Sequence, residues 1–349
     1  MPPKVSINIV AWNSMGFLPD LLRSIFEQTY KNFQVLVIDN GSDDGVEAFV
    51  RENYPQVSVL RNMRNLGFCA AHNQGIRFAL DRWSEAEQKE NFIMVTNPDI
   101  ILTPTFLEQL VKATTNKTQV GFFGGKLMRA YSENFYDEAL RETIRSKEID
   151  STGLLAKKNR TFFDRGAGEE DQGQYDQLTD VFGFSGALCL YRAQALQDVR
   201  YQDEFFDQDF FAYKEDVDLS WRLQHLGWSA QFVPEAVAYH YRNMFGKEKM
   251  SVLKRLKNRR QKSKLRSYYS NRNHWNLLMK NERLLTGLLS AYRVWPHELM
   301  RFIYVLFFET ANVGSFFEAL KRAPLMFKKR QATMKKRRVK ALEVGQWFR

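Results

Sequence analysis

The stretch Val5-Ser6-Ile7-Asn8-Ile9-Val10-Ala11 opens the chain and, with the two elements that follow it, decides the fold. Its apolar residues alternate with serine and asparagine, which predicts a β-strand that enters a core. An apolar stripe at helical spacing comes next, formed by Leu18, Leu21, Leu22, Ile25 and Phe26. A second strand, residues 35–38, is apolar without interruption, as in a strand covered on both faces, and it ends at Asp39. The sequence therefore begins with a strand–helix–strand unit.

The same alternation repeats further along the chain. Residues 57–60 and 92–95 have strand character, and residues 70–80 between them have helical character. This order predicts an α/β fold with a mostly parallel sheet and helices on both faces. In such sheets ligands bind beyond the carboxyl ends of the strands, and Asp39 and Asp99 each follow a strand end. We therefore expect both aspartates at a ligand-binding edge.

The second half of the chain is less regular. Residues 121–191 indicate mixed sheet and loop, and Tyr213-Lys214-Glu215-Asp216 opens a helix that Gly227 is placed to end. After His240 the chain becomes basic, helical in pattern and rich in Phe, Leu and Met. We place a domain boundary near residue 245, between a domain of residues 1–245 and a basic, aromatic-rich helical extension of residues 246–349.

Size and composition exclude several classes of protein. A chain of 349 residues with 44% hydrophobic content can bury a full core, which excludes disorder. Cys69 and Cys189 have neither disulfide-framework nor zinc-site spacing, so we expect a reducing compartment. The longest purely apolar run, residues 302–308, is too short to span a bilayer, and no signal peptide is visible. These features predict a cytoplasmic protein.

The net charge of +11 is concentrated in two segments. Residues 245–273 contain eleven Lys and Arg against one acid, and residues 319–340 contain ten with no acid. The remainder has 30 basic and 39 acidic residues, a net charge of −9. The chain thus combines an acidic body with a basic C-terminal region.

Three groups of polar residues are candidates for chemistry: Asn97-Pro98-Asp99, Glu215-Asp216 and His240. Each has a structural alternative, since Asp99 suits a loop or helix cap, acids are favoured at helix N-termini, and a single histidine is more often part of a core. Together, however, they supply hard oxygen ligands, one imidazole and a spare carboxylate. This set suits Mg²⁺ or Mn²⁺ with a phosphate-bearing substrate.

The order of these groups resembles glycosyltransferase family 2 with a GT-A fold, over roughly residues 4–245. The matching pieces are 10–13 (Val-Ala-Trp-Asn), 39–42 (Asp-Asn-Gly-Ser), 65–68 (Asn-Leu-Gly-Phe), 72–75 (His-Asn-Gln-Gly), 97–99 (Asn-Pro-Asp), 186–187 (Gly-Ala) before 191–192 (Tyr-Arg), and 215–222 (Glu-Asp-Val-Asp-Leu-Ser-Trp-Arg). Within the family, Asn97-Pro98-Asp99, Ile149-Asp150-Ser151-Thr152-Gly153 and Phe206-Asp207 are most similar to bacterial rhamnosyltransferases.

The resemblance implies a nucleotide-sugar donor site at the strand ends. Ala11, Trp12 and Asn13 would line the base and ribose, and Asp39 would accept a hydrogen bond from a pyrimidine imide. The nucleotide pocket would be closed by Asn65, Gly67, Phe68 and Asn73. Asp99 and His240 would ligate the metal, while Asn97, which stands where the family commonly has aspartate, would contact the ribose or a metal-bound water.

The resemblance also implies an inverting transfer. A divalent cation would neutralise the departing nucleoside diphosphate, and Asp216 would act as general base on the acceptor hydroxyl. Glu215 and Trp221 would line the acceptor side, with the backbone at Gly186 close to the sugar. The favoured donor is dTDP-rhamnose, and the expected acceptor is a saccharide or lipid-linked saccharide of a cell-surface polysaccharide. Another nucleotide sugar, such as a UDP-hexose or UDP-galactofuranose, remains open.

The C-terminal region has two interpretations. Its apolar residues around 299–307 and the basic runs 328–330 and 335–338 together suit an anionic membrane surface, which predicts a peripheral protein on the cytoplasmic face. The alternative is a nucleic-acid-binding protein, since Tyr268, Tyr269, His274 and Trp275 are interleaved with basic residues. That reading gives the acidic body no purpose, so we expect no nucleic-acid partner.

Overall fold

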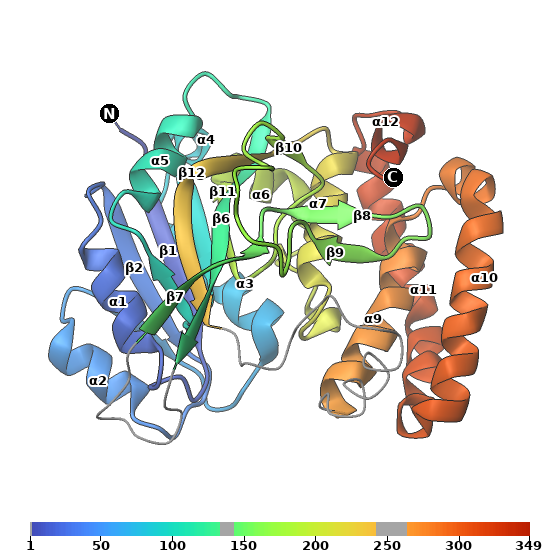
Figure 1. Cartoon of the computed structure of the whole chain (residues 1–349), viewed down its shortest axis with the longest axis horizontal. Coiled ribbons are helices and arrows are strands. Elements are labelled where there is room, and N and C mark those ends of the chain that lie inside the picture. Colours follow the sequence, from blue (N-terminus) through green and yellow to red (C-terminus); the bar gives the residue numbers. More distant parts are fainter. Residues whose placement is uncertain (1, 133–142, 242–263) are drawn as a thin grey trace.

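The computed structural model describes residues 2–132, 143–241 and 264–349. The predicted first unit is present as β1 (Val5–Ala11), α1 (Leu18–Phe26) and β2 (Phe33–Asp39). α1 has a proline in its first turn and buries its leucine stripe, as its spacing predicted. Figure 1 shows these elements at one end of the molecule and the C-terminal helices at the other.

One sheet of ten strands organises the described chain. Its main order is β10-β12-β6-β11-β4-β1-β2-β3, while β5 pairs with β12 and β7 with β6. The bounds are β3 (Ser58–Arg61), β4 (Phe92–Thr96), β5 (Ile100–Leu102), β6 (Val120–Ser132), β7 (Thr143–Ser151), β10 (Asp180–Val181), β11 (Leu188–Arg192) and β12 (Ser229–Tyr241). A separate hairpin is formed by β8 (Leu154–Ala156) and β9 (Phe162–Asp164).

The predicted parallel arrangement is confirmed for β3, β2, β1 and β4. Beyond β4 the sheet is mixed, because β11 pairs antiparallel with both β4 and β6, whereas β12 runs parallel to β6. This half coincides with the region that the sequence marked as irregular. Short strands and register shifts, including one between Val233 and Val237, explain why its periodicity was weak.

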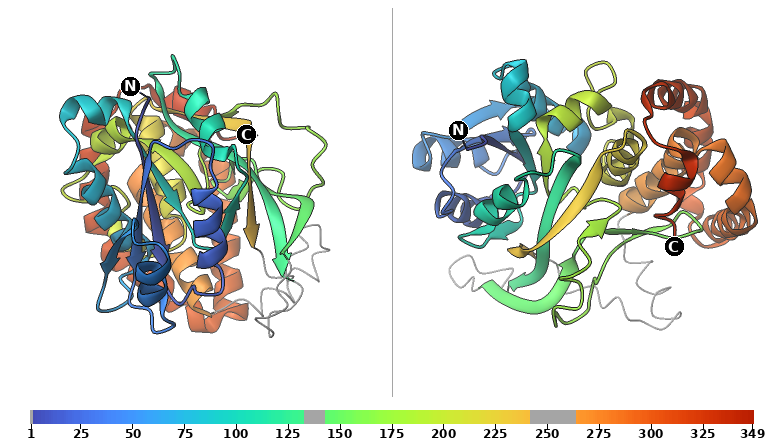
Figure 2. Two further views of the ribbon diagram at one scale, coloured as in Figure 1. Left: turned by 90° about the vertical axis from the view of Figure 1, so that its left-hand side faces the viewer. Right: turned by 90° about the horizontal axis from the view of Figure 1, so that it is seen from above.

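Helices cover both faces of the sheet, as Figure 2 shows from two sides. One face packs against α1, α2 (Val46–Asn53) and α5 (Phe106–Ala113), and the other against α3 (Gly67–Leu80), α6 (Ala193–Val199) and α7 (Glu215–His225). Alternate residues of one strand serve the two cores: Phe92 and Met94 point to the first, Ile93 and Val95 to the second. A short helix, α4 (Glu85–Glu90), precedes β4.

The C-terminal region folds onto the second core. It contains α9 (Lys264–Asn281), α10 (Leu284–Phe308), α11 (Gly314–Lys336) and α12 (Ala341–Gly345). Leu277, Met326, Val344 and Phe348 join the same buried cluster as α3 and α7. The predicted boundary near residue 245 lies outside the described residues, but the helices beyond it share a core with the sheet domain.

None of the described helices has by itself the length and apolar composition needed to cross a bilayer. Residues Leu284–Phe308 and Thr310–Lys336 meet these criteria only as a pair, and the pair is bent by 118°.

Candidate active site

The loops after β1 and β2 lie side by side at the carboxyl ends of their strands. Ala11 pairs with Asp39 in the strand register, and the Asn40 N–H donates to the Ala11 carbonyl at 2.8 Å. Asn13 has a left-handed φ of 49°, and its N–H donates to the Ser42 hydroxyl at 3.0 Å. Trp12 between them is 55% exposed. The loop thus leaves a large aromatic side chain uncovered at the strand ends, available to contact a planar group.

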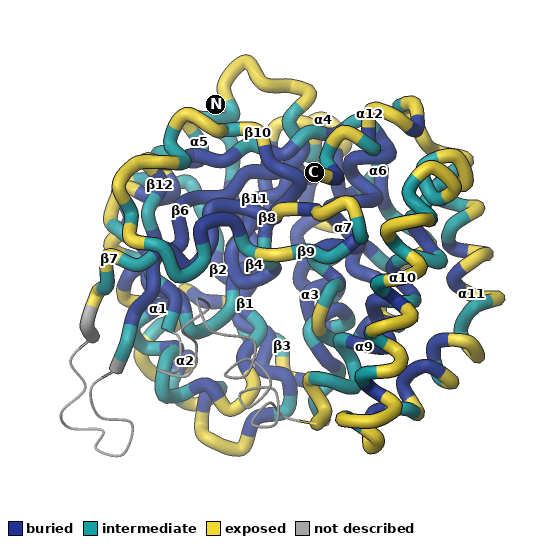
Figure 3. The backbone as a smooth tube through the Cα atoms, turned by 45° about the vertical axis from the view of Figure 1, so that its right-hand side comes forward, coloured by how far each residue is buried: buried dark blue, intermediate teal, exposed yellow. Residues whose placement is uncertain are grey.

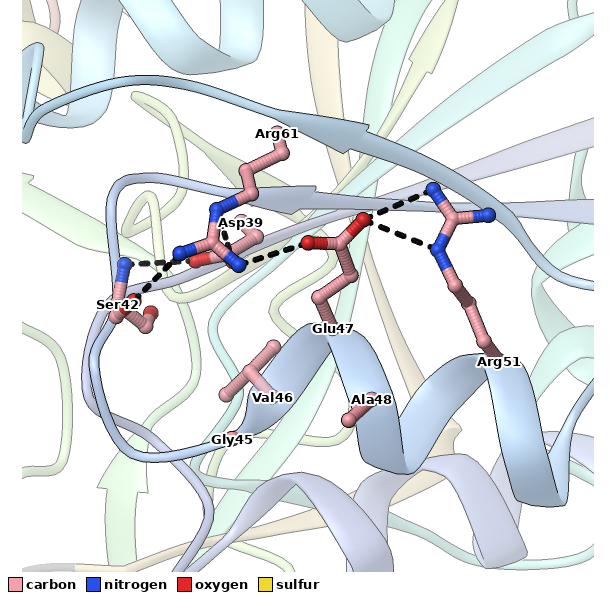
Figure 4. A pocket seen from close by; sticks show the side chains of 8 residues that line it. All are labelled: Asp39, Ser42, Gly45, Val46, Glu47, Ala48, Arg51 and Arg61. Carbon is pink, nitrogen blue, oxygen red and sulfur yellow. Dashed lines mark hydrogen bonds and ion pairs between the residues drawn. The ribbon is translucent and has the colours of Figure 1, made fainter.

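Asp39 borders a cavity of about 290 Å³ between the β2 loop and the start of α2 (Figure 4). Its Oδ1 accepts from the Ser42 N–H at 2.8 Å. Its Oδ2 is buried, has no hydrogen-bond donor among the described residues, and lies 3.8 Å from Nε of Arg61. Glu47 holds that guanidinium from the other side at 2.7 Å. The site therefore offers a fixed acceptor with an unused lone pair, the group that an imide N–H requires.

Asn65 and Gly67 tie the loop after β3 to the loop after β2. Oδ1 of Asn65 accepts from the Asn40 side chain at 2.9 Å and from the Gly67 N–H at 2.8 Å. Gly67 has a φ of 81°, and a Cβ there would lie 2.5 Å from the Phe211 ring. No other residue type fits this position, so the glycine is fixed by packing as well as by its backbone.

The structure places Asn73, which the resemblance assigns to the nucleotide pocket, inside the core. Its side chain is fully buried, with Nδ2 donating to the Phe206 carbonyl at 2.7 Å and Oδ1 accepting from the N–H groups of Phe205 and Phe206 at 3.1 and 2.9 Å. All of these contacts hold a loop that is distant in sequence. The asparagine satisfies buried backbone groups that would otherwise be unpaired.

Asp99 and His240 meet because β5 pairs antiparallel with β12. The register places His240 opposite Ile100, the neighbour of Asp99. Nε2 of the histidine lies 3.4 Å from Oδ2 of Asp99, and Nδ1 lies 2.8 Å from Oδ2 of Asp150. Oδ1 of Asp99 is buried and has no hydrogen-bond partner within residues 2–132, 143–241 and 264–349. A carboxylate behind the imidazole fixes its orientation, as is common for metal-binding histidines.

The charges around His240 also suit a cation. Burial alone would lower the pKa of His240, but Asp150 and Asp99 outweigh it and raise the pKa to about 9. The pair Asp99 and His240 supplies one carboxylate and one imidazole, and no described group of three or more acids, histidines or cysteines is arranged to hold an ion alone. These two residues fit a divalent metal that completes its coordination with substrate oxygens.

Asp150 belongs to the motif at residues 149–153 quoted above, for which the sequence predicts no site role. Its position after the apolar Ile149 indicates a strand facing the core, which is a signal for burial rather than for a site. Only the pairing of β7 with β6 and of β6 with β12 brings it to His240.

Asp216 lies at the start of α7 and faces Gly186. Its Oδ2 accepts from the Gly186 N–H at 3.1 Å, and its Oδ1 accepts from the Val217 N–H at 2.7 Å. A Cβ on Gly186 would lie 3.0 Å from the Phe68 ring and 3.6 Å from both Cβ of Asp216 and Oε1 of Glu215. Gly186, Glu215 and Asp216, which the resemblance assigns to the acceptor side, therefore form one cluster, and Phe68, which it assigns to the nucleotide pocket, joins them.

This cluster is connected to the Asp99 loop by the backbone. The Asn97 N–H donates to the Ala187 carbonyl at 2.8 Å, and Ala187 follows directly on Gly186. Asp99 on the loop after β4 and Asp216 at the start of α7 are thus linked through the Gly186-Ala187 segment, although they are far apart in sequence.

The structure places Trp221, which the resemblance assigns to the acceptor side, in the core. The side chain is 1% exposed and packs against Phe162, Phe182 and Phe348, with ring centroids 5.0 to 6.3 Å apart. One partner, Phe348, belongs to the C-terminal end of the chain. A tryptophan five residues after Asp216 faces a different side of the helix, and here that side is the core.

A buried ionic network, which the sequence did not predict, supports α7 from behind. Nζ of Lys280 on α9 lies 2.6 Å from Asp207 and 2.9 Å from Asp218, and Nζ of Lys329 on α11 lies 2.6 Å from Asp207. All four side chains are at most 5% exposed. The basic C-terminal region thus neutralises acids of the sheet domain, which explains part of the charge asymmetry.

The pH dependence of turnover should reflect the protonation of Glu215 and Asp216 at the start of α7. Burial raises the pKa of Asp216 and, with help from Asp216, that of Glu215. Because a general base must be deprotonated, we expect kcat/KM to fall on the acid side at a pH above the ordinary aspartate value of 3.8. A profile of kcat/KM from pH 4 to 9 measures this. A flat profile down to pH 4 would contradict it.

Comparison with known proteins identifies the chain's relatives. A family model described as "Glycosyltransferase like family 2" matches residues 2–263. The N-acetylglucosaminyl-diphospho-decaprenol L-rhamnosyltransferase of Mycobacterium tuberculosis is 29% identical over 239 residues, covering 67% of this chain and 74% of the relative. A galactofuranosyl glycosyltransferase of Leishmania donovani is 27% identical over 203 residues, covering 53% and 43%.

Solved structures confirm the fold. The structure of GalNAc-T7 with UDP, GalNAc and Mn²⁺ superimposes with a TM-score of 0.56 at 13% identity, covering 80% of this chain. This chain spans about half the length of that one, since the match covers 48% of it. The fold, the ordered motifs and the family match agree, and the chain belongs to glycosyltransferase family 2.

Proposed function

We propose that this protein transfers L-rhamnose from dTDP-rhamnose to a lipid-linked saccharide, with inversion at the anomeric carbon, in the synthesis of a cell-surface polysaccharide. The observation that supports it best is the placement of Asp99, on the loop after β4, against His240 of β12, with Asp216 of α7 bonded to the adjoining loop at Gly186. Asp99 and His240 suit a metal-bound diphosphate, and Asp216 suits an acceptor hydroxyl. Sugar transfer needs both groups.

At the donor end, the exposed Trp12 ring and the unused acceptor of Asp39 would bind and orient the pyrimidine base. Asp99 and His240 would hold Mg²⁺ or Mn²⁺. When bound, the metal supplies neutralisation of the negative charge that develops on the departing diphosphate. Asp150 would keep Nε2 of the histidine directed at the metal position.

At the acceptor end, Asp216 would take the proton from the attacking hydroxyl. The Gly186 and Val217 N–H groups fix its two oxygens, so it can be positioned without cost when the acceptor arrives. Attack from the face opposite the leaving group inverts the configuration in one step, without a covalent enzyme intermediate. Because Gly186 has no side chain, Phe68, Glu215 and Asp216 can pack against its backbone and bring the base next to it.

The identity of the sugar and acceptor rests on the relatives. The mycobacterial relative is named as an N-acetylglucosaminyl-diphospho-decaprenol L-rhamnosyltransferase, and the alignment with this chain covers 74% of that relative. The Leishmania relative is named as a galactofuranosyl enzyme but matches over less than half of its length. UDP-galactofuranose is therefore the second candidate donor.

A thermal-shift titration tests the donor site. Ligand at 100 times its Kd stabilises the folded state by about 2.7 kcal/mol, so we expect dTDP and UDP to raise Tm by several degrees in the presence of Mn²⁺, and GDP to have little effect. Asp99→Ala and His240→Ala should each remove the Mn²⁺-dependent part. Asp203→Ala, at an exposed carboxylate on the same domain, is the matched control. A shift that is equal with and without metal would overturn the metal assignment.

A donor panel then tests the sugar. Purified protein is incubated with dTDP-rhamnose, UDP-galactofuranose or UDP-glucose and a short-chain prenyl-diphosphate N-acetylglucosamine, and the products are analysed by mass spectrometry and NMR. We expect transfer from dTDP-rhamnose alone, with the anomeric configuration opposite to that of the donor. Transfer from a UDP-sugar only would replace the rhamnosyl assignment, and retention of configuration would overturn the mechanism.

A further inference from the structure

One long helix of this protein has its apolar side turned outward. Thirteen large apolar side chains of α10 are 36% to 79% exposed. At 100° per residue all of them except Phe308, at the end of the helix, fall within an arc of about 160° that contains no charged residue. We call this set the apolar face of α10; it consists of Leu284, Leu285, Leu288, Leu289, Tyr292, Trp295, Leu299, Met300, Phe302, Ile303, Leu306 and Phe307. Figure 3 shows the helix at the edge of the molecule with much of it exposed.

The polar side of the same helix faces the protein. Glu298 is 1% exposed and bonds Nε2 of His274 on α9 at 2.7 Å. Arg301 donates to Oδ1 of Asn271 at 2.8 Å. Ser290 accepts from the buried Arg160 at 2.9 Å. These bonds fix the rotation of the helix, so the outward direction of its apolar side is built into the fold.

The outward direction of the apolar side of α10 is unfavourable in water. A surface helix of a soluble domain buries its apolar stripe and exposes its polar one, and monomers rarely leave large continuous apolar patches in solvent. The opposite arrangement is stable only if the environment outside α10 is itself apolar. An apolar cavity of about 240 Å³ between α9, α10 and α11 opens beside the face, bordered by Trp275, Trp295 and Phe316.

We propose that the apolar face of α10 lies in the surface of a lipid bilayer, parallel to its plane, with the cavity beside it filled by hydrocarbon. A face of this kind with tyrosine and tryptophan is typical of interfacial helices. Protein interfaces include a polar rim and hydrogen-bonding groups, which this arc lacks apart from Tyr292 and Trp295. Exposed cations nearby in sequence, Arg293 at the edge of the arc and Lys321 and Lys328 on α11, suit anionic headgroups.

The sequence predicts a membrane contact from apolar and basic residues together, and the fold shifts the weight to the apolar ones. Lys329, in one of the basic runs, is buried against Asp207 and cannot reach a headgroup. Contact by the apolar face depends on burial of hydrocarbon, which salt does not screen. Binding through α10 should therefore survive an ionic strength that abolishes a purely electrostatic attachment.

Vesicle flotation of the full-length protein tests the proposal. Wild type is expected to float with phosphatidylcholine vesicles containing 30% phosphatidylglycerol, at both 0.1 M and 0.5 M NaCl. A Leu288→Glu/Leu299→Glu variant should float at least tenfold less. The matched control is Leu155→Glu/Leu178→Glu, at two leucines that are 43% and 55% exposed on other parts of the surface, and it should float like wild type.

Several outcomes would overturn the proposal. Wild type that stays in the dense fraction with these vesicles rejects it, as does equal flotation of the Leu288→Glu/Leu299→Glu variant. The main alternative is that the face is a contact between two copies of the chain, and light scattering tests it. A wild-type dimer that does not bind vesicles, and that the Leu288→Glu/Leu299→Glu substitutions convert to a monomer, would support this alternative. Nucleotide-dependent thermal shifts are measured on the same samples. Because the substitutions lie outside the donor site, normal shifts distinguish a failed membrane proposal from a failed catalytic one.

Discussion

Replacing Asp216 by asparagine is expected to lower kcat by about 10²- to 10⁴-fold, the range that a positioned general base contributes. Asparagine keeps the size of the side chain but cannot accept the acceptor's proton at neutral pH. Since burial already disfavours the charged carboxylate, removing the charge offsets the loss of one backbone hydrogen bond. The Tm should therefore change by only a few degrees. Steady-state transfer assays and thermal unfolding of the same preparation measure both quantities.

Two comparisons make this result interpretable. Asp203→Asn, at a carboxylate that is 76% exposed, should retain wild-type turnover. Glu215→Gln probes the neighbouring acid, whose Oε2 is buried and has no hydrogen-bond partner in the part of the chain that the structure describes. Near-normal turnover of Asp216→Asn together with loss of activity in Glu215→Gln would transfer the role of base to Glu215.

The largest effect on stability is expected at the ionic network behind α7. Lys280→Met leaves Asp207 and Asp218 buried with fewer cations, and breaking a buried pair by removing one partner costs about 3–5 kcal/mol. Lys328→Met, next to the buried Lys329 but exposed on α11, should change the free energy of unfolding by about 0.5 kcal/mol or less. Urea denaturation of the three proteins measures the difference.

A second substitution separates charge imbalance from lost packing. If uncompensated charge is the cause, Asp207→Asn in the Lys280→Met background should recover part of the lost stability. Equal midpoints for Lys280→Met and Lys328→Met would show that the network contributes nothing to the folded state.

The same network predicts how stability varies with pH. Burial alone would raise the pKa of Asp207, but Lys280 and Lys329 outweigh it and hold that pKa below the ordinary aspartate value. A carboxylate whose pKa is lower in the folded state stabilises the protein above its unfolded pKa, and this contribution is lost as the pH falls through the folded value. The free energy of unfolding should thus decrease below about pH 4, and less steeply in Lys280→Met than in wild type.

The local features of this protein were determined by its sequence. Strand β1, helix α1, the polar loops after β2 and β4, and the helix that begins at Glu215 all follow from the spacing of apolar residues and from where polar residues interrupt it. Such signals act within one strand or one helical turn, so they can be read without the fold. The order of the motifs was enough to indicate the family, and the family match agrees.

Tertiary structure decided which of those residues belong to the site. Asp99 meets His240 only because β5 pairs with β12, and Asp150 lies behind the histidine because β6 pairs with both β12 and β7. Asn73 and Trp221 look equivalent in sequence to site residues, yet packing turns both into the core, because the face of a helix that is buried depends on what covers it. The same reason governs the C-terminal region. Sequence gave its charge and apolar content, but only the fold shows that Lys280 and Lys329 are inside and the leucines of α10 are outside.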